Sequence, residues 1–502
     1  MVVDRPVSSK MLWDFYRMSP APLGLKISQP AEEAAGFFRY GPNLVCYGQA
    51  SIGTSDDISL AGRHDAQNAV RTSESEISLP FDFSLVVENL RKERYVKHLQ
   101  KGRSGATRHP LVRKAYYAVR ELLPVAVRRH FQKAYFKDWQ KIPFPNWPVD
   151  FTADLLHEEF LKLAMKVQGL KEIPFIWYWP EGASSCAIVT HDVETDVGRD
   201  FSSKLMDMDE NHGFRASFQV VPEKRYAVPQ SYWNEIRSRG FEFNIHDFNH
   251  DGYLFQERTE FEHRAKLING YARTYEARGF RAGAMYRNLD WYSSFEFSYD
   301  MSVPNVAHLE PQRGGCCTVM PFFVGNILEL PLTTSQDYSM FNILEDYTIE
   351  VWKKQIELIV KRNGLMSFLS HPDYLIDLKP RGVYDALLGH LRKVCDTQNV
   401  WHALPGEVDK WWRARSKMKI VNKEGEWQIE GPESGRARIA YAQLDGNRIA
   451  FTVTRPNTPK ADPQVQTRPI LLDVPKIADE QEEPQKQRVN LPNVARRLRR
   501  IP

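Results

Sequence analysis

The sequence predicts an α/β fold in which short parallel strands form a sheet or barrel covered by helices. Between residues 173 and 415, short apolar runs rich in β-branched residues alternate with stretches of helical periodicity, and this alternation is typical of a parallel sheet or barrel. Three short polar clusters stand at the ends of such apolar runs. Chemistry gathered at the C-terminal ends of strands is what a barrel enzyme requires.

The expected elements follow from the same patterns. Strands are expected at 186–190, 216–221, 241–245, 281–285, 300–303, 327–332 and 365–370. Helices are expected at 260–277, at 347–362 before the stop Asn363-Gly364, and at 383–395. A last helix, opened by Pro405-Gly406, carries Trp411 and Trp412. Paired tryptophans on a helix are more often core packing than a sugar platform, and we expect packing here.

Composition narrows the class of protein. Of 502 residues, 42% are apolar and 12% aromatic, which excludes global disorder and predicts one large domain with additions. The net charge of +4 is small for this length, so no nucleic-acid partner is expected. Five scattered cysteines without a Cys-x-x-Cys spacing indicate reduced packing residues. No apolar run reaches the roughly 18 to 20 residues of a membrane span and no signal-peptide core follows Met1, so we expect a cytoplasmic protein.

The first polar cluster is Thr190-His191-Asp192-Val193-Glu194, at the end of the first expected strand. Side chains on a strand repeat every second residue, so Asp192 and Glu194 share one side if the strand continues through Val193. One carboxylate can then bind a metal ion while the other accepts a proton from water. By itself, an acidic pair at a strand end is as consistent with a solvated loop.

The second cluster, His246-Asp247-Phe248-Asn249-His250, follows the expected strand 241–245. Two histidines four residues apart can reach one ion if the backbone turns helical after the strand. Such a pair is common by chance, and its position after a strand, like that of the acid pair, strengthens the prediction. Two histidines and one carboxylate leave room for water and substrate, as a catalytic zinc site requires.

Two further motifs complete the set. Gly279-Phe280-Arg281-Ala282-Gly283 supplies an arginine, and Ser370-His371-Pro372-Asp373 places a histidine at the end of the last expected strand. The alternative for His371 is a histidine that only caps a strand before a proline turn.

In their order, these motifs resemble those of the polysaccharide deacetylases of carbohydrate esterase family four, from about residue 184 to residue 412. The resemblance implies a distorted, seven-stranded (β/α) barrel. It also implies that Asp192 is the catalytic base, that Glu194, His246 and His250 hold the metal, and that Arg281 orients the base. Asp192 is the alternative metal ligand. The chain departs from the family pattern in two places, with Glu194 where aspartate is more common and Gly283 in place of a proline.

The chemistry of these residue types fits amide hydrolysis. A divalent ion lowers the pKa of its water toward roughly 7 and polarises a carbonyl. Asp192 would take the proton of that water, and His371 would protonate the leaving nitrogen if nearby carboxylates keep its pKa near or above neutral. A backbone N–H near Tyr286 would help the metal to stabilise the charged oxygen. Zinc suits the ligand set, although cobalt, nickel, manganese or iron could occupy it.

The regions outside the barrel are less defined. We expect a mixed, partly to mostly helical region at 1–172, the barrel at 173–415, a β appendage at 416–455 with a hairpin turn at Asp445-Gly446-Asn447, and a disordered tail with a basic end at 456–502. The Lys- and Arg-rich stretch 90–137 is either a set of solvated amphipathic helices, which we favour, or a surface for anionic membrane headgroups or substrate phosphates.

Two classes of function remain open. The favoured one is a metal-dependent hydrolase of carbon–nitrogen bonds that removes acetyl from an N-acetylated sugar or glycan precursor; within the same chemistry, the substrate could be a small non-sugar amide. The other is an inactive barrel that binds glycans or helps to assemble a surface polysaccharide. Tyr286, Trp291, Tyr292 and Tyr374 are candidates for stacking on sugar rings or for packing.

Overall fold

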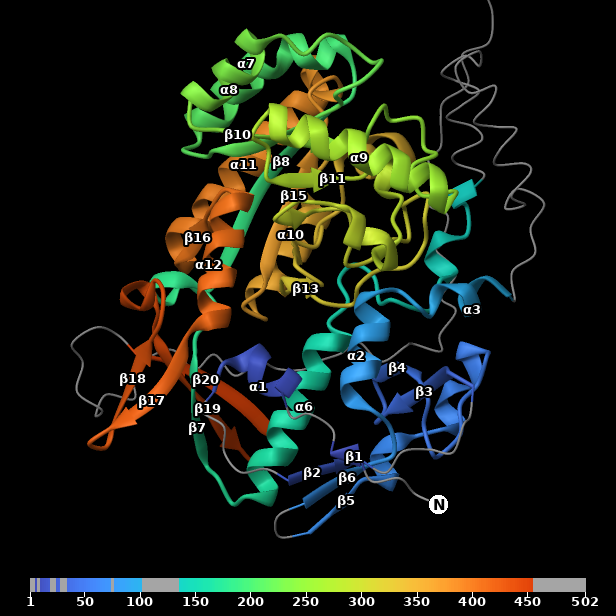
Figure 1. Ribbon diagram of the computed structural model, residues 1–502, viewed down its shortest axis with the longest axis vertical. Helices are drawn as coiled ribbons and strands as arrows, with labels where there is room; N and C mark the ends of the chain where they lie inside the picture. Colours follow the sequence, from blue (N-terminus) through green and yellow to red (C-terminus); the bar gives the residue numbers. More distant parts are fainter. Residues whose placement is uncertain are drawn as a thin grey trace, which may run out of the picture. The chain divides into compact units, whose positions relative to one another are not determined.

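A curled sheet of nine strands forms the centre of the protein (Figure 1). The computed structural model describes residues 5–6, 10–18, 24–27, 34–73, 76–101 and 135–454. The sheet order is β13-β14-β12-β11-β10-β9-β8-β15, with β16 beside β8, and all neighbours are parallel except β13 and β14. The strands are β8 (Ser185–Val193), β9 (Ala216–Val220), β10 (Glu242–His246), β11 (Gly279–Arg281), β12 (Tyr299–Asp300), β13 (Phe322–Val324), β14 (Ile327–Glu329), β15 (Leu365–Ser370) and β16 (Val400–His402).

The sequence prediction of a parallel α/β sheet is confirmed, and the strand count of seven is exceeded by β13 and β16. The expected strand 281–285 has the wrong bounds. β11 covers Gly279–Arg281, and residues Gly283–Met285 form a 3-10 turn. Ala284 and Met285 take positive φ angles of 53° and 54°, which a strand cannot contain. The apolar run therefore leaves the sheet just where the predicted site begins.

Helices follow the strands, as a βα alternation requires. Thr195 caps the first of them by accepting a hydrogen bond from the N–H of Gly198, so Glu194 lies between the end of β8 and the first turn of a helix. Trp411 and Trp412 are 1% and 6% exposed, which confirms that they pack in the core. The helices are α7 (Asp196–Asn211), α8 (Gln230–Ser238), α9 (Arg258–Thr274), α10 (Glu350–Val360), α11 (Leu378–Gln398) and α12 (Pro405–Lys417).

Threonine side chains, rather than a backbone ladder, join the two sides of the curled sheet. The hydroxyl of Thr333, beyond the end of β14, donates to the carbonyl of Leu365 at 2.7 Å and accepts from the N–H of Ser367 at 2.9 Å. The hydroxyl of Thr334 donates to the carbonyl of Ser367 at 2.7 Å. All of these groups are buried, so the barrel is distorted and only partly closed, in agreement with the expected fold.

The described part of the N-terminal region contains both strands and helices, in agreement with a mixed, partly helical region, whereas a mostly helical region is not confirmed. Residues on both sides of Gly41 form the antiparallel hairpin of β3 and β4, because their apolar and aromatic side chains suit a pleated, half-buried surface. The elements are β1 (Arg5–Pro6), α1 (Lys10–Tyr16), β2 (Gly24–Ile27), β3 (Gly36–Tyr40), β4 (Leu44–Gly48), β5 (Arg71–Thr72), β6 (Glu76–Leu79), α2 (Phe83–Arg91), α3 (Val96–Lys101) and α6 (Thr152–Val167).

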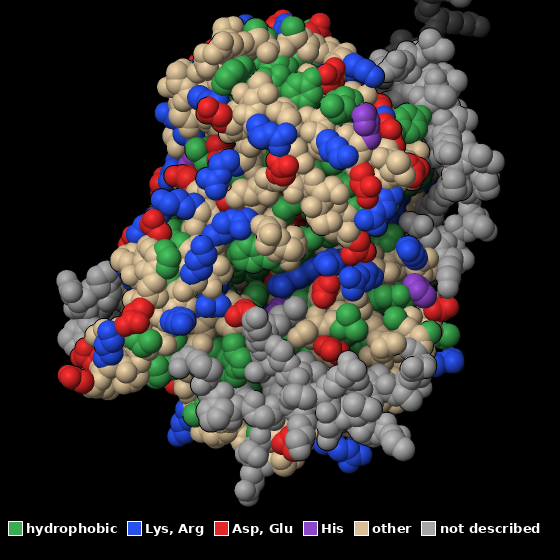
Figure 2. Space-filling model, viewed as in Figure 1, with side chains coloured by type: hydrophobic (Ala, Val, Ile, Leu, Met, Phe, Trp, Pro, Cys, Tyr) green, Lys and Arg blue, Asp and Glu red, His purple; other side chains and the backbone are tan. Residues whose placement is uncertain are grey.

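The basic stretch 90–137 is described only at 90–101 and 135–137, and its remainder lies outside the described residues. On the described part of the face drawn in Figure 2, basic and acidic side chains are interspersed rather than gathered by sign. All five cysteines are buried and unpaired, as packing residues should be. No described helix combines the length and the apolar character that crossing a membrane requires.

The C-terminal β segment is joined to the chain before the barrel. It contains β17 (Lys419–Lys423), β18 (Glu426–Glu430), β19 (Ile439–Asp445) and β20 (Arg448–Val453), and Gly446 has the positive φ of 57° that the predicted hairpin turn needs. β19 pairs on its other edge with β7 (Glu172–Ile176). The expected tail at 456–502 lies outside the described residues.

Candidate metal centre

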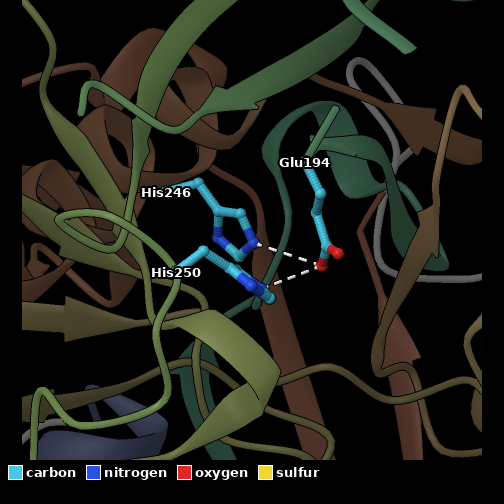
Figure 3. A group of neighbouring side chains, drawn as sticks. All are labelled: Glu194, His246 and His250. Carbon is cyan, nitrogen blue, oxygen red and sulfur yellow. Dashed lines mark ion pairs between the residues drawn. The ribbon is translucent and has the colours of Figure 1, made fainter. Parts of the chain in front are cut away.

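The predicted site residues come together at the C-terminal ends of neighbouring parallel strands. Glu194 follows β8, His246 is the last residue of β10, and His371 follows β15. Because these strands are parallel and near neighbours in the sheet, their carboxyl ends meet at one edge. His250 lies in the loop after β10 and points back toward the same carboxylate (Figure 3).

Glu194, His246 and His250 have the arrangement of a metal ligand set. The Nε2 atoms of His246 and His250 lie 3.7 and 2.9 Å from Oε1 of Glu194 (Figure 3). Among the described residues, these three form a group whose potential ligand atoms all lie within 4.8 Å of one another. Both Nε2 atoms are buried and make no hydrogen bond of good geometry. Buried, unsatisfied nitrogens aimed at one carboxylate are costly unless something else binds them, so the residues fit a divalent ion.

The path of the chain between the two histidines differs from the prediction. We expected a helical turn, but residues 247–250 form a bent loop in which Asp247 and His250 have positive φ angles of 58° and 54°. Non-glycine residues with such angles need support from their surroundings. The left-handed backbone at these two positions, instead of helical spacing, directs both imidazoles to Glu194.

Gly283 gives this loop the room it needs. A Cβ atom at Gly283 would lie 2.3 Å from Oδ2 of Asp247 and 2.9 Å from Cδ2 of His250. The N–H of Gly283 also donates to Oδ2 of Asp247 at 3.2 Å, and a proline has no N–H to donate. A glycine at position 283 is therefore required by the packing of this particular loop.

The far nitrogens of the two histidines have different partners. Nδ1 of His246 lies 3.1 Å from the carbonyl of Arg281, and a carbonyl accepts a proton from Nδ1 and leaves the lone pair of Nε2 free for a metal. Nδ1 of His250 instead lies 3.3 Å from the guanidinium of Arg225, which also donates to the carbonyl of His250 at 3.5 Å. Because a guanidinium only donates, its contact with Nδ1 has to loosen for Nε2 of the neutral ring to bind an ion. Sequence reasoning missed Arg225.

Asp192 is buried on the same side of β8 as Glu194. Its Oδ2 atom lies 3.6 Å from Nε2 of His246, and its Oδ1 accepts from the guanidinium of Arg281 at 2.9 Å. The predicted strand geometry through Val193 is thus present. Burial would raise the pKa of the Asp192 carboxyl, but Arg281, His246 and His371 hold this pKa below its ordinary value. The carboxylate is therefore ionised at neutral pH and can accept a proton.

Glu194 is also held ionised. Burial would raise the pKa of its carboxyl, yet His250, His246 and His371 lower this pKa well below the ordinary value. Both acids of the first cluster are thus negative, and the histidines and the arginine that contact them are those the motifs predicted.

His371 faces the same carboxylate from the end of β15, the strand next to β8. Its Nε2 atom lies 3.4 Å from Oε1 of Glu194, while Nδ1 and the backbone N–H both contact the carboxylate of Asp337 at 2.7 Å. Burial would lower the pKa of the imidazole, but Asp337 first and Glu194 second raise it well above the ordinary value. His371 is therefore protonated at neutral pH. Asp337 lies five residues beyond the expected strand 327–332 and belongs to none of the recognised motifs, so the sequence did not mark it.

A second buried group that the sequence did not reveal lies behind the acids. His191 contacts Oγ of Ser370 through Nδ1 and the carboxylate of Asp209 through Nε2, each at 2.9 Å. The hydroxyl of Tyr384 donates to the same carboxylate at 2.6 Å. This network joins the residues next to Asp192 and His371, and so it ties the ends of β8 and β15 together.

The backbone N–H and the aromatic residues that were also predicted near the site make contacts of several kinds. The N–H of Tyr286 itself donates to the carbonyl of Gly283 at 3.2 Å, so the expectation of an oxyanion-stabilising N–H near Tyr286 stays a prediction for its neighbours. Tyr292 donates to Asp300 and, with Trp291, packs among phenylalanines. Of the candidate sugar-stacking residues, Tyr374 lies at the centre, with its ring 4.9 Å from that of His371.

Comparison with solved structures gives similarities over about half of the chain. One is a putative polysaccharide deacetylase from Mycobacterium smegmatis, with 17% identity, 50% of this chain and 98% of that chain covered, and a TM-score of 0.38. Another is a family 4 carbohydrate esterase from Streptomyces lividans in complex with acetate, with 10% identity, 44% and 93% coverage and a TM-score of 0.29. A third is the Puue allantoinase, with 11% identity, 47% and 92% coverage and a TM-score of 0.35.

The matched structures include polysaccharide deacetylases. No family model matches the chain, and no curated protein does. The motifs and the geometry of the centre are therefore what indicates a function.

Proposed function

We propose that this protein is a metal-dependent hydrolase that cleaves an amide bond, and that its substrate is an N-acetylated sugar or glycan precursor from which it removes acetyl. One observation carries the proposal. Two buried histidine nitrogens without hydrogen-bond partners face Glu194, and beside them lie Asp192, whose pKa is held below its ordinary value, and His371, whose pKa is held above it. These are the groups that hydrolysis of an amide requires.

Each residue has a role that follows from its charge and contacts. Glu194, His246 and His250 would hold the ion, which supplies a Lewis acid for the amide carbonyl and for water. Asp192, kept ionised and oriented by Arg281, accepts the proton of the attacking water. His371, kept protonated by Asp337, donates a proton to the leaving nitrogen, which departs as a neutral amine.

The sugar is inferred from what surrounds the centre. Tyr374 offers an aromatic ring next to His371, and aromatic faces stack on the apolar faces of sugar rings. Zinc is the ion we propose, since two imidazoles and one carboxylate suit it. A small non-sugar amide would use the same groups and is the alternative substrate.

The first experiment measures metal content. Wild-type protein and the His246→Ala/His250→Ala double variant, both purified without an affinity-tag metal step, are analysed by plasma mass spectrometry. We expect about one divalent ion per wild-type chain and none in the variant. Wild-type protein that takes up no ion even after reconstitution would contradict the proposal and favour a glycan-binding barrel.

The second experiment separates the two acids. Asp192→Asn should retain the ion and lose the release of acetate from N-acetylated sugars, because Asn cannot accept the proton. Glu194→Gln should lose the ion. If Asp192→Asn instead lost the ion while Glu194→Gln kept it, the assignment of base and ligand would be reversed. Ring opening of a small cyclic amide to an open-chain acid, without acetate release from any sugar, would identify the other substrate class.

A further inference from the structure

A buried ion pair connects the N-terminal region to the turn that follows β11. Glu93, between α2 and α3, receives the Nε–H of Arg287 on Oε2 at 2.6 Å and a second guanidinium N–H on Oε1. Oε1 also accepts from the N–H of Gly315 at 2.6 Å. Arg287 and Glu93 are 4% and 8% exposed. A bidentate pair of this kind fixes orientation as well as charge, so the position of Arg287 depends on a residue far away in the sequence.

Arg287 in turn holds the backbone of the turn. Its Nη1 atom donates to the carbonyl of Met285 at 2.7 Å. The side chain of Gln312 contacts both the N–H and the carbonyl of Arg287 at 3.1 Å. Between these anchors, Ala284 and Met285 have positive φ angles, and non-glycine residues keep such angles only where surrounding contacts determine them.

The same turn supports the loop that carries His250. Gly283, at the start of the turn, donates to Asp247 and leaves no space for a Cβ atom against Asp247 and His250. Asp247 and His250 themselves have positive φ angles. A continuous chain of contacts therefore runs from Glu93 through Arg287 and the turn 283–287 to the metal centre.

We propose that Glu93 is a positioning residue of the metal centre, and that through Arg287 the N-terminal region sets the affinity for the ion. The proposal rests on the metal site of the proposed function. Groups that orient ligands without touching the ion are typically worth roughly 10- to 100-fold in metal affinity. Glu93 touches no ligand, so its effect passes through the turn that fixes the loop 247–250.

The test compares zinc affinities of the full chain. The dissociation constant is measured by competition with a chromophoric chelator for wild type, Glu93→Gln and Glu93→Asp. Glu93→Asp keeps the charge but is one methylene shorter and cannot reach Arg287 and Gly315 together, and it serves if Glu93→Gln does not fold. The matched control is Glu88→Gln, on α2 and five residues before Glu93, which changes a partly exposed carboxylate paired with Lys92 and Arg94.

We expect the Glu93 variants to bind zinc roughly 10- to 100-fold more weakly than wild type, with a cooperative melting transition in the apo form and with Glu88→Gln unchanged. A folded Glu93 variant with the wild-type dissociation constant would overturn this inference and leave the proposed function intact. Equal losses in Glu93→Gln and Glu88→Gln would also overturn it, since the effect would then be one of surface charge. Wild-type protein that binds no zinc would instead overturn the proposed function.

Discussion

The missing Cβ of Gly283 determines how closely the turn after β11 approaches the histidine loop. In Gly283→Ala the added carbon would overlap Asp247 and His250, so the loop would have to move. We predict that zinc binding weakens by roughly tenfold or more and that the free energy of unfolding falls by about 1–3 kcal/mol. Chelator competition and chemical denaturation measure the two effects.

The control for this substitution is Gly270→Ala in α9, where no atom lies within 4 Å of the added carbon. An alanine there should raise the free energy of unfolding by about 0.5–1 kcal/mol, because glycine is a poor helix former. If Gly283→Ala behaved like Gly270→Ala, with zinc affinity unchanged, the packing account of Gly283 would be wrong.

At the residue scale, the sequence indicated the groups that end strands and missed those that arrive from elsewhere. Asp192, His246 and His371 each stand at the end of an apolar run, so strand periodicity located them. Asp337 and Arg225 stand five and four residues beyond the expected strands 327–332 and 216–221, outside any recognised motif, and only the folded chain brings them to His371 and His250. The local sequence pattern therefore predicts the functional side chains at strand ends, but it gives no information about the partners that set their charge and tautomer.

At the scale of elements, Thr333 joins β15 to the segment after β14. In Thr333→Val the buried N–H of Ser367 loses its acceptor and the carbonyl of Leu365 loses a donor. Leaving such groups unsatisfied costs about 1–3 kcal/mol each, so we predict a loss of this order in the free energy of unfolding. Chemical denaturation checks it against Thr274→Val, an exposed position. A change within about 0.5 kcal/mol in both variants would show that the hydroxyl does not stabilise the closure.

The central strands were predictable because both faces of each are buried, which makes their sequences continuous apolar runs. Short strands without such a run could not be predicted in this way, and β13 and β16 have only three residues each. The N-terminal strands were not predicted for a related reason. β3 and β4 stabilise each other as the two arms of an aromatic hairpin, and this pairing exists only in the folded chain. Residues 283–285 have the apolar pattern of a strand, but the contacts of this turn with the loop 247–250 determine its conformation instead.

At the scale of the whole molecule, two buried carboxyls couple stability to pH. Burial raises the pKa of Asp154, on α6, to about 6 and that of Glu242, on β10, to about 7. Both values exceed the ordinary ones of 3.8 and 4.5, so the unfolded chain releases these protons first. Their contribution to stability is complete below about pH 4 and is lost as pH rises through about 6 and 7.

We therefore predict that Asp154→Asn/Glu242→Gln flattens the decline of stability between about pH 4 and pH 7. Each carboxyl contributes a slope of about 1.4 kcal/mol per pH unit where only the unfolded chain is ionised. The measurement is the difference in the free energy of unfolding between wild type and variant across this range. Glu262→Gln, an exposed acid paired with Arg258, is the control, and a pH-independent difference for the double variant would contradict the prediction.

The sequence by itself determined the parallel α/β core, the order of its strands along the chain and the identity of the groups at their C-terminal ends. Those features depend on local periodicity and on side-chain type, both of which can be identified in the sequence itself. Tertiary structure decided that β19 joins β7, that threonines close the barrel, that Asp337 charges His371 and that Glu93 anchors the turn beside His250. These depend on contacts between distant segments, whose burial and distance exist only once the chain has folded.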